Sequence, residues 1–125
     1  MLMPAREGVG GGCHDRRMTT TTITPDQDVM TLVNVFTVEP DRQQELVDLL
    51  VRATDEVMQH LPGFVSANIH RSDDGEHVVN YAQWATLADF EAMQRDPRAS
   101  EHMGGAAAIA SFAPVVCRVV HSAHA

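Results

Sequence analysis

Residues 62–85, PGFVSANIHRSDDGEHVVNYAQWA, contain two β-strand patterns separated by a turn signal. Residues 64–71 and 77–85 are rich in β-branched, aromatic and small apolar side chains, which is typical of strands. Asp74-Gly75 lies between them, and this dipeptide is a strong hairpin signal. The stretch therefore predicts two neighbouring antiparallel strands.

A helix and a further strand are predicted upstream of this hairpin. Residues 29–38 are mostly β-branched and apolar and predict a strand. Pro40 and Asp41 open a helix, with Asp41 and Gln44 spaced like a capping box, and Pro62-Gly63 ends it. Its apolar stripe repeats at helical spacing: Leu46, Leu49, Leu50, Ala53, Val57 and Leu61.

Downstream, a helical region begins near Thr86, is interrupted near Pro97, and includes the alanine-rich residues 106–112. Pro114 then introduces a last strand over residues 115–121. The order strand, helix, strand, strand, helix, strand predicts an α+β fold of the ferredoxin-like, split βαβ (βαββαβ) type. Right-handed crossovers give an antiparallel sheet of order 4-1-3-2, with the first and third strands at its centre.

The chain of 125 residues has room for one domain. Residues 1–28 are rich in Gly and Thr, lack apolar periodicity and are expected to be a disordered leader, with the domain over residues 29–125. The net charge of −8, without a basic cluster, argues against nucleic acid as a partner. No apolar run is long enough to span a membrane and no secretory signal is recognisable, so a cytoplasmic location is expected.

Two asparagines interrupt apolar strand faces. Because side chains alternate along a strand, Asn34 shares a face with Leu32 and Phe36. Asn80 likewise shares a face with Val78, Ala82 and Trp84 on the neighbouring strand, so both amides are expected in one space between sheet and helices. They are either satisfied core amides, with Trp84 an ordinary core aromatic, or a binding site for a flat molecule.

The opposite face of the third strand carries Val79 and Tyr81, and no third helix is left to cover it. An exposed apolar sheet face favours an interface, here a homodimer built around a shared α+β barrel. Dinucleotide, phosphate and nucleophile-elbow motifs are absent, and the histidines show no metal-ligand spacing. The residues therefore do not support a metal site.

Three segments resemble the antibiotic biosynthesis monooxygenase (ABM) superfamily: Pro62-Gly-Phe-Val-Ser-Ala, Val78-Val-Asn-Tyr-Ala-Gln-Trp84 and Asp96-Pro-Arg98. The likeness covers roughly residues 29–121 and is greatest to the actinorhodin-type enzymes that form quinones in aromatic polyketide pathways. It implies a dimeric, cofactor-independent monooxygenase that oxidises a polycyclic phenol or anthrone-type aromatic to a quinone with dioxygen.

The resemblance also implies roles for particular residues. Asn80 and Trp84 fall on the family's catalytic Asn and Trp, and Asn34 on a further Asn used by nogalamycin-pathway relatives. These groups are expected to stabilise the substrate anion by hydrogen bonding. Further substrate contacts are expected from Phe36, Phe64, Phe90, Met93 and His102.

The sequence departs from the actinorhodin-type pattern at two positions. A family Tyr aligns with Phe90 and a family Arg lies near Met103, so a proton donor and a cation are missing, and His102 could take over part of their role. Two alternatives to quinone formation follow. One is a haem-binding or haem-degrading ABM-type oxygenase with Asn34 and His102 at the haem. The other is a non-catalytic dimeric ligand-binding domain.

Overall fold

A computed structural model describes residues 19–125 of the chain. Within these residues the predicted order is confirmed, with the second helical region divided in two. The elements are β1 (Met30–Val38), the 3-10 turn η1 (Pro40–Arg42), α1 (Gln43–Glu56), the 3-10 turn η2 (Met58–His60), β2 (Phe64–Arg71), β3 (His77–Trp84), α2 (Leu87–Arg95), α3 (Pro97–Ile109) and β4 (Ala110–Cys117). In this part of the chain no helix combines the length and apolar character needed to cross a membrane.

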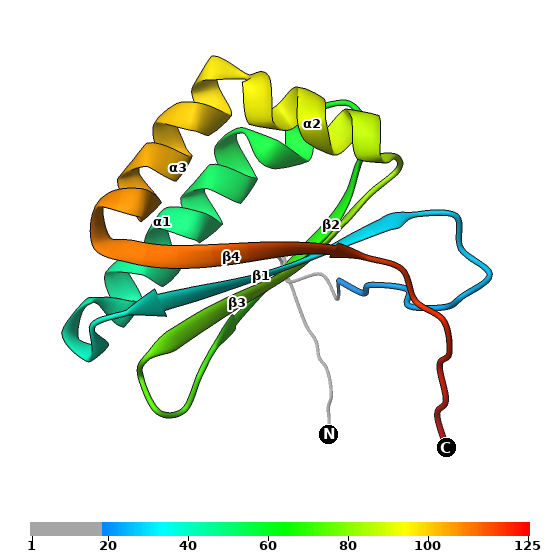
Figure 1. The fold of residues 1–125 in the computed structure, drawn as a ribbon, viewed down its shortest axis with the longest axis horizontal. Helices are drawn as coiled ribbons and strands as arrows, with labels where there is room; N and C mark the ends of the chain where they lie inside the picture. The colour runs from blue at the N-terminus through cyan, green and yellow to red at the C-terminus, as the bar shows by residue number, and fades with distance from the viewer. Residues whose placement is uncertain (1–18) are drawn as a thin grey trace, which may run out of the picture.

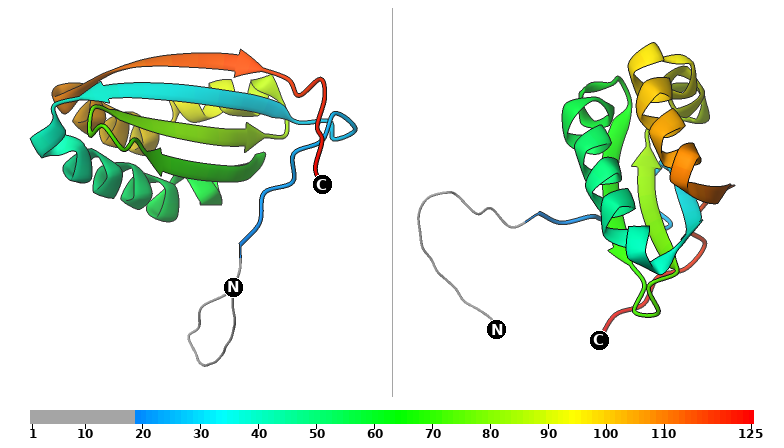
Figure 2. Two further views of the ribbon diagram at one scale, coloured as in Figure 1. Left: turned by 90° about the horizontal axis from the view of Figure 1, so that it is seen from below. Right: turned by 90° about the vertical axis from the view of Figure 1, so that its left-hand side faces the viewer.

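The four strands form one antiparallel sheet of order β2-β3-β1-β4, which is the predicted order read from the other edge. The strands lie side by side in this order in Figure 2. The helices cover one face of the sheet (Figure 1). The α+β, ferredoxin-like prediction is therefore correct.

The core lies between this face and the helices. One cluster joins Phe36, Val38 and Val78 to Leu46 and Leu50 of α1. A second cluster, nearer the start of β1, consists of Met30, Leu32, Ala82, Trp84 and Phe90. The two asparagines lie between these clusters in the sequence of each central strand, so polar groups are set into an otherwise apolar layer.

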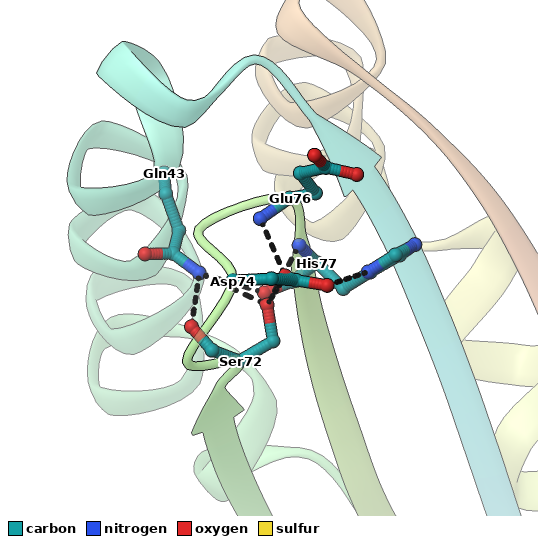
Figure 3. A network of polar contacts seen from close by, with 5 residues as sticks. All are labelled: Gln43, Ser72, Asp74, Glu76 and His77. Atoms are coloured by element: carbon teal, nitrogen blue, oxygen red, sulfur yellow. Dashed lines mark hydrogen bonds and ion pairs between the residues drawn. The ribbon is translucent and has the colours of Figure 1, made fainter.

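The β2–β3 hairpin is attached to α1 by the polar contacts shown in Figure 3. The amide of Gln43 donates to the carbonyl oxygens of Ser72 (3.1 Å) and His77 (2.9 Å). Asp74 accepts from the hydroxyl of Ser72 at 2.6 Å and from the backbone N–H of Glu76 at 2.9 Å. These two hydrogen bonds lower the pKa of the Asp74 carboxyl. The hairpin therefore fixes the register in which β3 enters the sheet.

The predicted capping box is wrong. Pro40 opens the short 3-10 turn η1, so α1 begins only at Gln43, and the residue at its N-cap, Arg42, makes no side-chain cap. The Gln44 amide donates to Asp48 at 2.9 Å instead. The helix also ends at Glu56, before the predicted Leu61.

The start of the last strand was also predicted wrongly. Residues 110–112, assigned to the alanine-rich helical region, are the first residues of β4, and Pro114 lies within that strand rather than before it. Pairing with β1 overrides the helix preference of Ala110, the one alanine of these three residues. Proline is tolerated because β4 is an edge strand, where half of the N–H groups need no ladder partner.

Residues 19–28 belong to the segment expected to be disordered, but the structure places part of it against the outer face of β2 and β3. The Thr21 hydroxyl donates to Asn68 at 2.7 Å, and the buried Gln83 amide donates to the carbonyl of Thr22 at 2.8 Å. The rest of the expected leader, residues 1–18, lies outside the described residues. Residues 21 and 22 thus contact β2 and β3 on the face that was expected to be open.

Candidate active site

Asn34 and Asn80 lie directly opposite each other in the β1–β3 pair. Side chains at paired positions share a face, and their Cβ atoms stand about 4.5–5.5 Å apart. Both amides are on the helix-covered face, since their neighbours Leu32, Phe36 and Val78 belong to the core. The two asparagines therefore lie side by side on the helix-covered face, as the strand alternation predicts.

Each of these amides has an unused acceptor. The Oδ1 atoms of Asn34 and Asn80 are buried, and neither has a hydrogen-bond partner among the described residues. Leaving such a group unpaired costs about 1–3 kcal/mol. A carboxamide carries an oxygen acceptor and two N–H donors, so either polarity can be turned toward a ligand. Two such amides side by side can bind a ligand that offers O–H donors or oxygen acceptors.

Asn34 opens onto a cavity of about 200 Å³ between the sheet and the helices. Four elements line it, and most of the lining is apolar: Leu32 and Asn34 of β1, Phe90, Met93 and Gln94 of α2, Ala99, Ser100 and Met103 of α3, and Phe112 and Pro114 of β4. Asn80 is not among the lining residues and lies across the strand pair behind Asn34. The cavity can therefore receive a flat apolar group against one amide, with the second amide next to the first.

Trp84 lies deep in the layer beneath this cavity. It is 2 % exposed and packs edge-to-face on Phe64, with ring centroids 5.5 Å apart. Its centroid is 6.4 Å from that of Phe90, which lines the cavity together with Met93. The structure therefore brings Phe90 and Met93 to the cavity and sets Trp84 and Phe64 behind Phe90.

Phe36 and His102 occupy different places. Phe36 is 1 % exposed and lies 5.2 Å, between ring centroids, from Phe112 of the lining. His102 faces α1, where its Nε2 atom is 3.9 Å from a carboxylate oxygen of Glu56. The next residue of α3, Met103, lines the cavity instead. Phe36 thus supports the lining through Phe112, and His102 is not brought to it.

Sequence reasoning missed several lining residues. Leu32 could have been found, because it shares a strand face with Asn34. Phe112 and Pro114 were missed because β4 was placed too late in the chain. The remaining polar contributors, Gln94 and Ser100, flank the junction between α2 and α3, and nothing in the sequence pattern marks which side chain of that junction faces the sheet.

Side-chain caps hold the two lining helices in place. Thr86 caps α2 by accepting from the backbone N–H of Asp89 at 3.0 Å. Asp96 caps α3 by accepting from the N–H of Arg98 at 2.8 Å. The side-chain hydrogen bonds of Arg98 hold the pKa of the Asp96 carboxyl below its usual value, so the carboxylate at the positive end of α3 stays charged. The two caps therefore fix the turn at Pro97. As a result, side chains of both helices line the cavity.

A known protein family matches this chain. The family model described as antibiotic biosynthesis monooxygenase matches residues 29–104. The chain belongs to this family. The match includes β1, β3, both lining helices up to Gly104, and all three residues predicted to be catalytic. This member of the ABM family is a monooxygenase.

Curated and solved relatives agree with this assignment. The chain is 52% identical over 101 residues to the tetracenomycin-F1 monooxygenase of Streptomyces glaucescens, covering 81% of this chain and 90% of the relative. A monooxygenase from the gene ActVA-Orf6 of Streptomyces coelicolor, solved in complex with the ligand nanaomycin D, is 28% identical with a TM-score of 0.72, over 79% of this chain and 94% of that one.

A third relative supports the fold alone. SnoaB, a cofactor-independent oxygenase from Streptomyces nogalater, is 24% identical with a TM-score of 0.69, and the match covers 76% of this chain and 96% of that one. At this level of identity the agreement concerns the course of the backbone. The ferredoxin-like arrangement of this ABM monooxygenase is therefore shared with a solved oxygenase.

Proposed function

We propose that this ABM monooxygenase oxidises a polycyclic phenol or anthrone-type aromatic to a quinone with dioxygen, without a cofactor. The observation that carries the proposal is the facing pair Asn34 and Asn80, whose buried carbonyl oxygens have no partner in the described structure, beside an apolar cavity. A flat aromatic fits the apolar lining, and its phenolic O–H groups can donate to the amide oxygens that lack a partner. The relatives named above, of which one is a tetracenomycin-F1 monooxygenase and one was solved with nanaomycin D, support a substrate of this class.

The proposed reaction uses the substrate as its own reductant. Loss of one proton from the reacting carbon gives an electron-rich anion, which transfers one electron to dioxygen. The resulting pair of radicals joins to form a C–O bond, and the peroxide takes up a proton. Cleavage of the O–O bond, with loss of the second proton of that carbon, leaves a carbonyl group and releases water.

In this scheme the protein's residues stabilise the negative charge of the substrate anion and keep water away from the reacting atoms. Asn34, with Asn80 beside it, turns an N–H donor toward the phenolate or enolate oxygen as negative charge develops there. Trp84 closes the layer behind Phe90, and its indole N–H is the further donor that we assign to the site. The apolar lining keeps water from the anion and the peroxide.

Haem is the competing cofactor, and we expect it not to bind as a histidine-ligated complex. His102, the candidate iron ligand, faces Glu56 on α1 and does not line the cavity. Titration of the full chain with hemin should therefore give the spectrum of free hemin. A sharp Soret band that disappears in His102→Ala would contradict cofactor-free chemistry, whereas a band unaffected by His102→Ala would indicate adventitious binding at the surface.

We further propose that the enzyme is a homodimer formed through the outer face of β1 and β4. Residues 21 and 22 contact β2 and β3, but apolar side chains on the other half of the sheet stay exposed, with Val35 at 36% and its near neighbour Val115 at 55%. Val33 pairs with Val115, and Val35 with Ala113, so these side chains form one continuous strip. Contiguous apolar strips of this kind favour a symmetric interface.

The interface is tested with one added charge. Val115→Glu places a carboxylate in the strip on both subunits and should shift the chain from dimer to monomer in light scattering coupled to gel filtration. Val120→Glu is the control, because Val120 lies beyond β4 and is 88% exposed. A wild-type chain that is monomeric at micromolar concentration would contradict the dimer.

A further inference from the structure

A second hollow lies at the end of the sheet where β1 begins and β4 ends. Its volume is about 530 Å³, and it is lined by Asp28, Met30, Ala85, Thr86, Leu87, Val116, Cys117 and Arg118. Unlike the cavity at Asn34, which no charged side chain of the described residues lines, it is lined by the charged side chains of Asp28 and Arg118. It contains none of the residues to which a catalytic role was assigned.

Three elements each contribute to both hollows, through residues that are neighbours on one face. On β1, Leu32 lines the cavity and Met30 the second hollow; on β4, Pro114 and Val116 do the same. Residues two apart on a strand share a face, so each pair forms a continuous row. On α2, Phe90 and Leu87 are three residues apart and lie on the same side of the helix. Leu32 and Val116 are also paired across the β1–β4 ladder.

The size of the first cavity also points to a longer site. Pockets for small molecules generally measure about 300–1,000 Å³. The cavity at Asn34, at about 200 Å³, is below that range, whereas the second hollow at about 530 Å³ falls within it. In the second hollow two apolar side chains remain uncovered, with Val116 49% and Leu87 47% exposed. A polycyclic ligand held at Asn34 would extend over these two side chains.

Arg118 supplies a charge at the far end. Its Nη1 atom is 3.5 Å from a carboxylate oxygen of Asp28, and the two side chains are 68% and 97% exposed. An ion pair this long and this exposed contributes little. The guanidinium group, with its fork of N–H donors, is therefore available to a carboxylate, which it can bind through two hydrogen bonds.

We propose that the two hollows form one groove that binds a fused-ring aromatic, with its reacting end at Asn34 and a carboxylate at its other end on Arg118. The inference rests on the proposed function and adds a second contact to the same site: Arg118 binds an anionic substituent of the aromatic that is remote from the reacting carbon. Val116 and Leu87 bind the rings between the two ends.

Two probes and two variants test the groove. The probes are 1-naphthol, which is short and carries no carboxylate, and anthraquinone-2-carboxylate, which is longer and anionic. Binding to the full chain is followed by quenching of Trp84, the single tryptophan of the sequence. Val116→Glu should raise the Kd for anthraquinone-2-carboxylate about tenfold or more, and Arg118→Gln about fivefold, while the Kd for 1-naphthol stays unchanged.

Controls separate this inference from the function on which it rests. Val120→Glu adds the same charge in the C-terminal tail, and Arg52→Gln removes one from the exposed face of α1; neither should alter either Kd. If both probes bind the wild type but neither groove variant selectively weakens the longer one, the groove is wrong and the proposed function stands. If neither probe binds the wild type, both fail.

Discussion

Replacement of Asn34 by leucine is expected to lower kcat/KM about 10²–10³-fold, the usual loss when one donor to a developing oxyanion is removed. The same change should leave the free energy of unfolding unchanged or raise it by about 1 kcal/mol, because it removes a buried acceptor that has no partner. Leucine has the same number and branching of side-chain heavy atoms as asparagine, and its apolar methyl groups suit the neighbouring Leu32 and Phe36. Activity and stability thus move in opposite directions, as is common for residues kept for function.

Thr31→Val is the matched control for this experiment. The Thr31 hydroxyl is another buried oxygen without a partner in the described structure, on the same strand but on the opposite face of the sheet. Its replacement should affect stability in the same way and leave kcat/KM unchanged. An Asn34→Leu variant that loses stability but keeps its rate would mean that Asn34 is only a core amide.

Replacement of Trp84 by alanine is expected to cost about 3–5 kcal/mol of unfolding free energy, the usual range for deleting a buried aromatic side chain. The indole is 2 % exposed and contacts both Phe64 and Phe90, so its removal leaves a cavity directly behind the lining. Because domains are stabilised by about 5–15 kcal/mol, this is a large share of the total. Chemical denaturation followed by circular dichroism measures the change.

Trp84→Phe separates packing from chemistry. Phenylalanine keeps an aromatic ring between Phe64 and Phe90 but has no N–H, so most of the stability should be retained while kcat/KM falls about tenfold or more. Leu46→Ala, in the other core cluster, is the control: it should lose about 2–5 kcal/mol yet keep its rate per folded molecule. Full activity in Trp84→Phe would leave Trp84 a purely structural residue.

The sequence predicts that Asn34 and Asn80 lie side by side, because this arrangement depends on only two structural regularities. Alternation along each strand fixes the face, and the split βαβ connection makes the two strands neighbours. The hairpin signal at Asp74-Gly75 was sufficient to position β3. These local rules do not depend on how the helices pack.

The rest of the site depends on packing, which local pattern does not determine. Successive helical residues point about 100° apart, so whether His102 or Met103 faces the sheet is decided by how α3 rests on α1. The start of β4 was misjudged because alanine favours helix in isolation, whereas pairing with β1 draws Ala110 into the sheet. Two lining residues, Phe112 and Pro114, were lost with that error.

Oxygen uptake by the metal-stripped full chain with dithranol, an anthrone, tests the central claim most directly. The account predicts uptake above the uncatalysed rate, one dioxygen consumed for each quinone formed, and a return to near the uncatalysed rate in Asn34→Leu but not in Thr31→Val. Uptake that never exceeds the uncatalysed rate, or that appears only when a flavin, haem or metal ion is added, would contradict it.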